Sequence, residues 1–430
     1  MDDAALGAIA DIPLTPQAKG FPLDGRFATV RELRAARPSV FDDGFSTPFA
    51  VLHEDAIAGN VRKMAQFCAA NGVLLAPHAK TSMAPQLFAR QLSHGAWGLT
   101  VATMRQAAVC RAFGVSRLLL ANELAEPPAL AWAAGQLADD GFTLLSYADS
   151  AEQVRRSAGT LAGLRLPRPL DVLLEVGYPG GRAGCRTIAA IEATVDAVTR
   201  SRHHRLAGVA GFEGLLGHDA LPETIGRVGG YLRQVRRAAE HIAGRGGFDG
   251  AGPVLLSAGG SAYFDIAAQQ LAGPLPGGRA VQVILRCGRY IAHEAGRYSQ
   301  VSPFSRVAAL AGGAGPLQQA AEVWASVLAR PEPGLVILNA GQRDVPVDAG
   351  LPVPLRVRRG SAMADAPGQW RAESANDQHL YLRLPRADPL APGDLVCLGI
   401  THPCTFFDKW AWIPVVDSGY RVTDAIRTYF

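Results

Sequence analysis

The sequence predicts a (β/α)8 barrel followed by an antiparallel β domain, and two observations support this fold class. From about residue 73, short apolar and often β-branched runs alternate with longer segments of helical period, which is typical of a parallel sheet joined by crossover helices. After residue 300, short apolar runs are separated by Pro and Gly turns without helical stretches of matching length, which indicates antiparallel strands. At 430 residues the chain exceeds what one core usually supports, so two domains are expected.

Eight strands can be counted in the first part of the chain. We predict them at 73–77, 98–102, 117–121, 143–147, 170–175, 206–212, 254–257 and 280–285. Eight strands with seven helical connections favour a barrel, whose catalytic groups lie on the loops that follow the strands. The alternative is a doubly wound open sheet, but no strand is followed by the G-x-G-x-x-G turn that usually opens a dinucleotide-binding unit.

The last part of the chain contains the runs "GLVILNAGQ", "LPVPLRVRRG", "HLYLRLP" and "GDLVCLGI", which predict the strands of the β domain. The preceding segment, 303–330, combines a Gly-rich interruption with an alanine-rich helical pattern. We predict that this segment is a helical excursion at the junction of the two domains.

Charge and composition exclude several classes of protein. The formal charge is only +4 and the arginines are scattered, so no nucleic-acid partner is expected, and a small anionic ligand fits better. The N-terminus is acidic where a secretory signal is basic, and no run of about 18 apolar residues follows, which predicts a cytoplasmic protein without a membrane partner. The six cysteines are thinly spread, as buried fillers would be, and only Cys404 has neighbours that suggest chemistry.

Lys80 stands out because the chain has only four lysines beside 38 arginines. It lies in "PHAKT", three residues past the first predicted strand, with His78 before it. Lysine forms Schiff bases with carbonyl compounds, and arginine cannot replace it because its guanidinium stays protonated. The position therefore indicates a catalytic lysine, although a solvated loop lysine would fit the same position.

The segment "GITHPCTFFDKW", 399–410, contains an H-x-C triplet at His402 and Cys404. If this segment is extended, the two side chains point to the same side and can converge on one ion. Nitrogen and sulfur ligands favour zinc, and two protein ligands leave coordination positions open. A buried cysteine beside a hydrogen-bonded histidine is the alternative.

Three further loops are candidates for binding a ligand. "SAGGSAYFD", 257–265, and "RCGRYIAHEAG", 286–296, follow the seventh and eighth strands, where barrels commonly bind phosphate. Backbone N–H groups of Gly259 and Gly260 and the hydroxyl of Ser261 are the predicted donors. "EVGYPGGRAGCR", 175–186, offers Arg182 and Arg186 to an anionic or ring-nitrogen partner, and ordinary turns or surface arginines would explain the same residues.

Together "PHAKT", "GGRAG", "SAGGS" and "THPCTFFDKW" resemble, in order, the motifs of the fold-type III pyridoxal-phosphate enzymes of the D-serine dehydratase and D-threonine aldolase group. The resemblance covers roughly 47–420 and implies an alanine racemase-like barrel. It implies an N-terminal segment, 1–46, that pairs with the β domain, a pyridoxal-phosphate-binding barrel at 47–300, and a β domain carrying the metal motif at 301–430. It also implies a homodimer.

The resemblance also implies a role for each matching residue. Lys80 would bind pyridoxal 5'-phosphate covalently and act as base, His78 would lie near the cofactor, and Arg182 would face its pyridine nitrogen. Gly259, Gly260 and Ser261 would bind the phosphate, and His402 with Cys404 would hold Zn2+. Two departures, Ala76 for the usual arginine and Phe406 for the usual threonine, resemble an amino-acid deaminase-like subgroup and leave the substrate open.

The activity implied is a lyase that eliminates water from D-serine or a related β-hydroxy-D-amino acid, giving a 2-oxo acid and ammonia. Similar aldolases tend to have Asp at the position of Cys404 and use Mn2+ (Mg2+ is a further possibility), so the sulfur ligand favours dehydration. Metal-dependent cleavage to glycine and an aldehyde is the alternative. A non-catalytic pyridoxal-phosphate-binding protein is a further alternative, but it would leave "HPC" without a purpose.

Overall fold

The structure is a computed structural model that describes residues 1–15, 18–250, 252–311 and 315–430. The chain divides into two compact units: unit 1 holds Met1, 64–80 and 91–288, and unit 2 holds 2–63, 81–90 and 289–430. Three elements contribute residues to both units: α3 (Glu54–Ala70), η1 (Ala79–Thr81) and α4 (Pro85–Ser93). The domain limits inferred from the sequence stay a prediction.

Unit 1 is built on eight parallel strands, ordered β2-β9-β8-β7-β6-β5-β4-β3. They are β2 (Leu74–Leu75), β3 (Leu99–Val101), β4 (Arg117–Glu123), β5 (Thr143–Ala148), β6 (Leu170–Val176), β7 (His204–Gly211), β8 (Val254–Ala258) and β9 (Val281–Leu285). The two ends of the sheet meet where Trp97 N–H donates to Leu75 O at 2.7 Å and Thr100 N–H donates to Pro77 O at 2.9 Å. The predicted barrel and all eight of its strands are confirmed.

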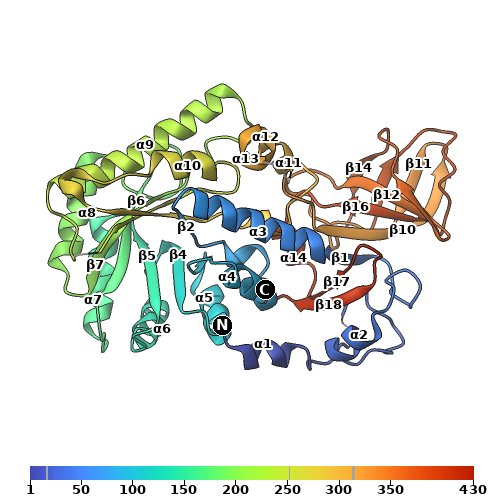
Figure 1. Cartoon of the computed structure of the whole chain (residues 1–430), viewed down its shortest axis with the longest axis horizontal. Helices are drawn as coiled ribbons and strands as arrows, with labels where there is room; N and C mark the ends of the chain where they lie inside the picture. Colours follow the sequence, from blue (N-terminus) through green and yellow to red (C-terminus); the bar gives the residue numbers. More distant parts are fainter. Residues whose placement is uncertain (16–17, 251, 312–314) are drawn as a thin grey trace. The chain divides into compact units, whose positions relative to one another are not determined.

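Helices connect the strands of unit 1, and Figure 1 shows β4 to β7 side by side with α6 to α8 flanking them. The helices are α5 (Met104–Ala112), α6 (Pro127–Gln136), α7 (Ala151–Ala162), α8 (Ile188–Arg200), α9 (Pro222–Gly244), α10 (Phe264–Gln270) and the short η2 (Pro276–Gly278). Thr103, Ser150 and Thr187 cap α5, α7 and α8, each accepting a backbone N–H of the first turn. These caps fix where each strand-to-helix loop ends.

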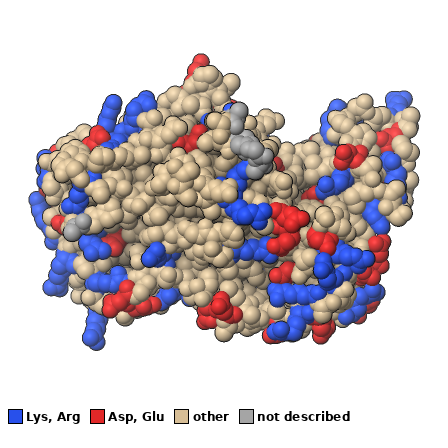
Figure 2. Space-filling view, in the orientation of Figure 1, with Lys and Arg blue, Asp and Glu red and all other residues tan. Residues whose placement is uncertain are grey.

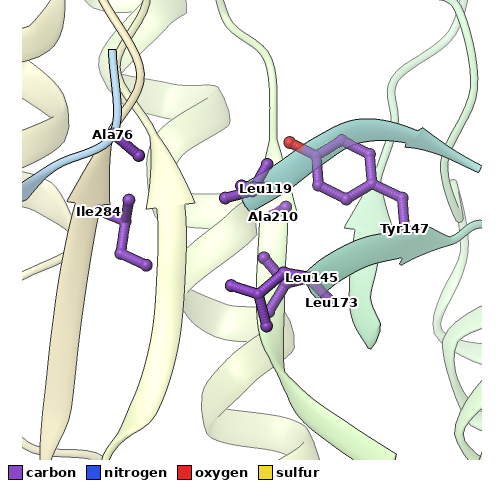
Figure 3. Close-up of a cluster of buried hydrophobic side chains, with 7 residues drawn as sticks. All are labelled: Ala76, Leu119, Leu145, Tyr147, Leu173, Ala210 and Ile284. Carbon is purple, nitrogen blue, oxygen red and sulfur yellow. The ribbon is translucent and has the colours of Figure 1, made fainter. Parts of the chain in front are cut away.

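The barrel interior has an apolar floor, drawn in Figure 3. Its seven buried side chains come from strands around the barrel, or in one case directly follow a strand: Ala76, Leu119, Leu145, Tyr147, Leu173, Ala210 and Ile284. Such interior layers are packed cores rather than pores. A ligand of this barrel is therefore expected beyond the floor, at the C-terminal ends of the strands.

Unit 2 contains a ten-stranded sheet ordered β13-β12-β16-β10-β1-β17-β18, with β11, β15 and β14 branching from β10. The strands are β1 (Phe49–His53), β10 (Ala321–Glu332), β11 (Leu335–Leu338), β12 (Val353–Arg359), β13 (Ala362–Asp365), β14 (Arg371–Ala375), β15 (Leu380–Arg383), β16 (Leu395–Gly399), β17 (Trp412–Val416) and β18 (Val422–Arg427). Every pair is antiparallel except β1 with β17. The predicted antiparallel β domain is confirmed.

In the N-terminal part of unit 2, residues 30–36 and Phe41 pack on this sheet. It contains α1 (Asp3–Ile9) and α2 (Val30–Ala36), and Arg34 of α2 forms an ion pair with Asp424 of β18 at 2.6 Å. The ring of Phe41 lies 4.9 Å from those of Trp324 and Tyr420, centroid to centroid. Residues near the start of the chain thus complete a core formed with residues near its end.

The helical prediction for 303–330 is wrong over its last third. Two short helices, α12 (Pro303–Arg306) and α13 (Ala308–Ala311), follow η3 (Arg289–Ile291) and α11 (Tyr298–Val301), but residues 321–332 form strand β10. β10 lies between β1 and β16, and its first seven residues are buried or half-buried on both faces. A strand buried on both faces has a continuous apolar run, which periodicity does not separate from a buried helix. Residues 312–314 lie outside the described residues.

Basic and acidic side chains are interspersed on the face shown in Figure 2. Many of them form ion pairs within one unit, such as Arg90 with Glu54 at 2.6 Å and Arg245 with Glu192 at 3.0 Å. Exposed pairs of this kind contribute only about 0–1 kcal/mol each, so they shape the surface more than the stability. Within the described residues, no helix has both the length and the apolar character needed to cross a bilayer.

Candidate active site

Lys80 and His78 follow β2 directly. Lys80 is the middle residue of η1, and His78 is joined to Thr100 by a parallel bridge that continues the barrel sheet. His78 Nδ1 is buried and has no hydrogen-bond partner among the described residues. Burial, followed by the positive charges of Lys80, Arg286 and Arg182, holds the pKa of His78 well below its ordinary value. The imidazole is therefore neutral beside the candidate lysine.

A layer of polar side chains lies next to the apolar floor of the barrel. His78, Glu175, Ser257 and Arg286 each come two residues after a side chain of the floor or one packed against it, so strand alternation points them inward. Glu123 is paired in register with Tyr147, whose hydroxyl is visible in Figure 3. We name His78, Glu123, Glu175, Ser257, Arg286 and the hydroxyl of Tyr147, whose ring belongs to the floor, the polar layer.

Two atoms of the polar layer have no hydrogen-bond partner. His78 Nδ1 and the Tyr147 hydroxyl are buried without a hydrogen bond to any described residue. Buried polar groups in native proteins are nearly always hydrogen-bonded, so each exception calls for an explanation. A polar ligand bound at the layer would explain these atoms by supplying their hydrogen-bond partners. A polar cofactor such as pyridoxal phosphate fits this requirement.

Arg286 is the buried cation of the polar layer, and it was not predicted from the sequence. Its guanidinium donates to Ser257 Oγ at 2.7 Å and to Gly211 O at 2.6 Å, and the residue is only 4% exposed. Arg182, the predicted partner of the ring nitrogen, is exposed, with its guanidinium 4.7 Å from the Phe212 ring centroid. The available signal was the position of Arg286 in "RCGRY", directly after β9.

Glu175 and Glu123 are a carboxyl pair within the polar layer. Burial, followed by a hydrogen bond with Glu123, raises the pKa of Glu175, while Arg286 and Arg182 oppose the shift. Two carboxylates in contact cannot both ionise cheaply, so the pair holds a proton near neutral pH. Neither residue was singled out from the sequence, because the pair forms only when β4 and β6 fold into one barrel.

The predicted phosphate donors belong to a turn that already binds an anion. Gly259 N–H and Gly260 N–H donate to the two carboxylate oxygens of Glu213 at 3.2 and 2.5 Å, and Glu213 is fully buried. Gly259 has φ +86°, and a Cβ there would lie 2.6 Å from Leu285 Cδ2, so the turn requires glycine. Ser261 follows in the same turn. The carboxylate stands where an anion would, which fits an anion-binding role but also competes with phosphate.

His402 and Cys404 lie in unit 2, at the start of α14 (Cys404–Phe407). The prediction that this segment is extended is wrong, because Pro403 has φ −56° and ψ −40° and begins a helical turn. Proline fits there because the first turn of a helix needs no N–H from it. Despite the different backbone, the imidazole and the thiol interact with each other.

The electrostatics of this pair suit a metal thiolate. Burial alone would raise the pKa of the Cys404 thiol, but hydrogen bonding and charge from His402, with the Thr81 hydroxyl, lower it overall. The pKa of His402 is raised by Cys404 and Asp348 against the effect of burial. Thr81 Oγ1 lies 3.4 Å from Cys404 Sγ, and Thr81 is the residue after Lys80. A residue joined to Lys80 by a peptide bond therefore contacts the thiol of the second motif.

Around His402 the protein supplies partners but not a complete metal cage. Asp348 Oδ2 lies 2.5 Å from His402 Nδ1, which leaves Nε2 for another ligand. Among the described residues, no group of three or more His, Cys, Asp or Glu side chains is arranged to hold a metal ion. Two protein ligands, one nitrogen and one sulfur, fit a zinc site completed by water or substrate.

Comparison with known proteins agrees with the barrel and its attached domain. The family model "Alanine racemase, N-terminal domain" matches residues 52–267, and the model "Putative serine dehydratase domain" matches residues 320–416. The barrel with its lysine after the first strand thus defines a class, the alanine racemase-like barrel proteins. Within that class, the chain belongs to the fold-type III pyridoxal-phosphate family that carries this second domain, as the sequence motifs predicted.

Three relatives illustrate the range of the family. The 3-hydroxy-D-aspartate aldolase of Paracoccus denitrificans (strain Pd 1222) is 23% identical over 74% of this chain and 77% of its own. The D-threonine aldolase of Arthrobacter sp is 27% identical, over 87% and 89%. The D-threo-3-hydroxyaspartate dehydratase of Delftia sp. (strain HT23) is 34% identical over 32% and 35%. Its solved structure aligns over 90% of this chain and 98% of that one, with a TM-score of 0.70 at 21% identity. All three are lyases, in agreement with the predicted enzyme class.

Proposed function

We propose that this protein is a pyridoxal 5'-phosphate- and zinc-dependent lyase that eliminates water from D-serine or a related β-hydroxy-D-amino acid. Water leaves in the elimination, and hydrolysis of the resulting enamine consumes water and releases ammonia and a 2-oxo acid. His78, Lys80, Arg182, Gly259, Gly260 and Ser261 are the proposed cofactor residues, and His402 and Cys404 the proposed metal ligands. One of the relatives is a dehydratase, and a solved structure of that dehydratase is of a metal-free form.

One observation carries the proposal: the Cys404 thiol, beside His402, contacts the hydroxyl of Thr81, the neighbour of Lys80 in the chain. Sulfur is a zinc ligand and a poor ligand for harder ions such as Mn2+, so Cys404 supports zinc at the leaving group. The lowered pKa of the thiol agrees with a thiolate ligand. Thr81 and Cys404 both belong to unit 2, so the contact lies within that unit although more than 300 residues separate the two in the sequence.

When bound, pyridoxal phosphate supplies an electron sink for the charge left at Cα, and zinc supplies a Lewis acid for the departing hydroxyl. Lys80 Nζ would hold the cofactor, and as a free amine it would be the base for the Cα proton of the substrate. Neutral His78 offers Nδ1 to the bound molecule. Arg286, fixed by Ser257 and Gly211, is a better-held candidate for the ring nitrogen than the exposed Arg182.

The second candidate function is retro-aldol cleavage of a D-threonine-like substrate to glycine and an aldehyde. Two of the three relatives are aldolases, which favours this alternative. Cleavage requires a base for the β-hydroxyl proton instead of an acid that assists its departure. A non-catalytic pyridoxal-phosphate-binding protein remains a further alternative, and it leaves the His402–Cys404 motif unexplained.

The resemblance to the D-serine dehydratase and D-threonine aldolase group supports three more proposals. We propose that the protein is a cytoplasmic homodimer, that it binds a small-molecule substrate, and that its metal is Zn2+ rather than Mn2+ or Mg2+.

Product analysis tests the function. Purified protein loaded with cofactor and zinc is incubated with D-serine and with D-threonine, and ammonia, 2-oxo acid, glycine and aldehyde are measured. We expect ammonia and 2-oxo acid in equal amounts. If glycine and aldehyde are the main products, the activity is retro-aldol cleavage and the dehydratase proposal is wrong. If neither substrate gives a product, a non-catalytic binding protein is favoured. The matched variant Cys404→Asp, which exchanges sulfur for a harder oxygen ligand, is expected to lose zinc-supported ammonia release.

A further inference from the structure

Asp348 lies outside the sequence motifs, yet both of its carboxylate oxygens are used at the His402–Cys404 pair. Oδ2 lies 2.5 Å from His402 Nδ1, and Oδ1 accepts a hydrogen bond from Thr405 Oγ1 at 2.6 Å. Thr405 is the second residue of α14, so the same turn that carries Cys404 also holds the carboxylate. His402, Asp348 and Thr405 therefore form one short hydrogen-bonded chain within unit 2.

The loop that carries Asp348 is itself tied to the segment before the helix. The loop runs between β11 and β12, and Thr401 Oγ1 donates to Gly350 O at 2.7 Å. A parallel bridge joins Asp348 and Gly350 across the loop. Thr401, His402 and Thr405 thus each bind this loop, which fixes Asp348 from both sides of the histidine.

The chemistry of histidine gives this arrangement a consequence. A carboxylate at Nδ1 accepts the Nδ1 proton, so the neutral ring carries its lone pair on Nε2, the form that binds a metal. We propose that Asp348, held by Thr405, is the positioning residue of the metal site: it fixes the tautomer and the ring orientation of His402. This inference rests on the proposed function, because it assumes a metal on His402 and Cys404.

A plain surface ion pair is a weaker account of the same contact. The side chain of Asp348 is 48% exposed and that of His402 20%, and exposed pairs gain little from their charges. The geometry instead uses both carboxylate oxygens toward two residues of one turn. The other explanation is that Asp348 binds the metal directly. In that case Asp348→Asn should lose zinc, whereas a positioning residue should tolerate this substitution.

Zinc affinity of the holoenzyme tests the positioning role without relying on activity. Zinc content after dialysis against buffered free zinc, and competition with a chromophoric chelator, are measured for wild type, Asp348→Ala, Asp348→Asn and Thr405→Val. We expect Asp348→Ala to weaken zinc binding by about 10- to 100-fold with one zinc still bound at saturation. Asp348→Asn keeps an oxygen that accepts the Nδ1–H of His402, so its zinc affinity should stay within about threefold of wild type. The zinc affinity of Thr405→Val should lie between those of Asp348→Ala and Asp348→Asn.

Controls separate this inference from the proposed function. Asp365→Ala, the same substitution on the exposed strand β13, should leave zinc affinity unchanged, and thermal melts identify variants that fail to fold. Wild-type affinity in Asp348→Ala would overturn the positioning role, while loss of zinc in both Asp348→Ala and Asp348→Asn would make Asp348 a ligand and overturn it too. Stoichiometric zinc in His402→Ala would instead overturn the metal site of the proposed function.

Discussion

The two candidate sites differ in how far the protein satisfies its own polar groups. In the polar layer of unit 1, His78 Nδ1 and the Tyr147 hydroxyl are buried without partners among the described residues. In unit 2, the groups around His402 and Cys404 bind one another through Asp348, Thr405 and Thr81. The first region is incomplete without a polar ligand, whereas the second already holds its two candidate metal ligands in hydrogen-bonded positions.

This difference teaches what each ligand must contribute. A buried polar group without a hydrogen bond costs about 1–3 kcal/mol of folding free energy. A cofactor that hydrogen-bonds to such atoms removes this cost, and its affinity rises accordingly. A metal ion gains nothing of that kind from a satisfied motif, and its affinity depends on ligand type and orientation. The two ligands should therefore bind and be removed independently.

Replacing Lys80 has the largest expected effect. Lys80→Ala removes the group proposed both to hold the cofactor and to take the Cα proton, so lyase activity should fall by about 10³-fold or more. The yellow absorption band of lysine-bound cofactor should also be absent. Lys63→Ala, a lysine outside the polar layer, is the control. A yellow band that persists in Lys80→Ala would remove Lys80 from its central role.

Removing the metal should separate the two sites. Dialysis against dipicolinate is expected to lower ammonia release from D-serine by about 100-fold, because a metal at a leaving group is worth several kcal/mol. The yellow band should remain, and added Zn2+ should restore activity. Ammonia release that continues undiminished after chelation would take His402 and Cys404 out of the reaction.

The two arginines should differ in their contribution to stability. Arg286→Ala leaves Ser257 Oγ and Gly211 O inside the barrel without their donor, so the free energy of unfolding should fall by about 2–4 kcal/mol. Arg182→Ala, on an exposed side chain, should change it by less than about 1 kcal/mol. Urea unfolding of the cofactor-free protein measures both. Equal effects would contradict the assignment of Arg286 as the buried cation.

The carboxyl pair predicts a pH dependence of stability. The pKa of Glu175 is raised in the folded state, so the folded protein binds more protons than the unfolded chain above about pH 4.5. The contribution of this group to the free energy of unfolding is therefore greatest in acid and declines by about 1–2 kcal/mol as pH rises through neutrality. Glu175→Gln should flatten this part of the profile in urea titrations. An unchanged slope would show that the pair does not hold a proton.

The smallest expected effect concerns Glu213. Glu213→Gln keeps an acceptor for one glycine N–H but removes the negative charge next to the predicted phosphate donors. Pyridoxal phosphate should then bind a few-fold more tightly, since two buried anions no longer compete for the same amides. Fluorescence titration of the cofactor-free protein measures the change. Weaker binding would mean that Glu213 supports the turn and that phosphate is held by other groups.

Much of the fold could be predicted because it depends on local patterns. Strands such as β6 and β7 are dense apolar runs between helical segments, and their order in a parallel barrel follows from the chain order. β10 was misread because burial on both faces erases alternation. The extended prediction for the H-x-C triplet failed because proline is compatible with both a strand edge and the start of a helix, and here Pro403 starts a helix.

The predicted site residues came from motifs, and the residues that were missed come from packing. Arg286, Glu213 and Asp348 have no motif of their own, and each gains its partners from strands or loops distant in sequence. Buried charge within a chain cannot be read from spacing, because it depends on which strands become neighbours. The register of β4, β5 and β6, rather than any local signal, brings Glu123, Tyr147 and Glu175 together.

The position of β1 in the sheet has a consequence for synthesis of the chain. Its partners β10 and β17 begin only at residues 321 and 412. At about 5–20 residues per second, the apolar segment Phe49–His53 leaves the ribosome roughly 15 to 50 s before β10 is made. All eight barrel strands are translated within that interval. The apolar segment Phe49–His53 thus has no strand partner while the barrel is being translated. A chaperone that binds this segment would raise the yield of folded protein.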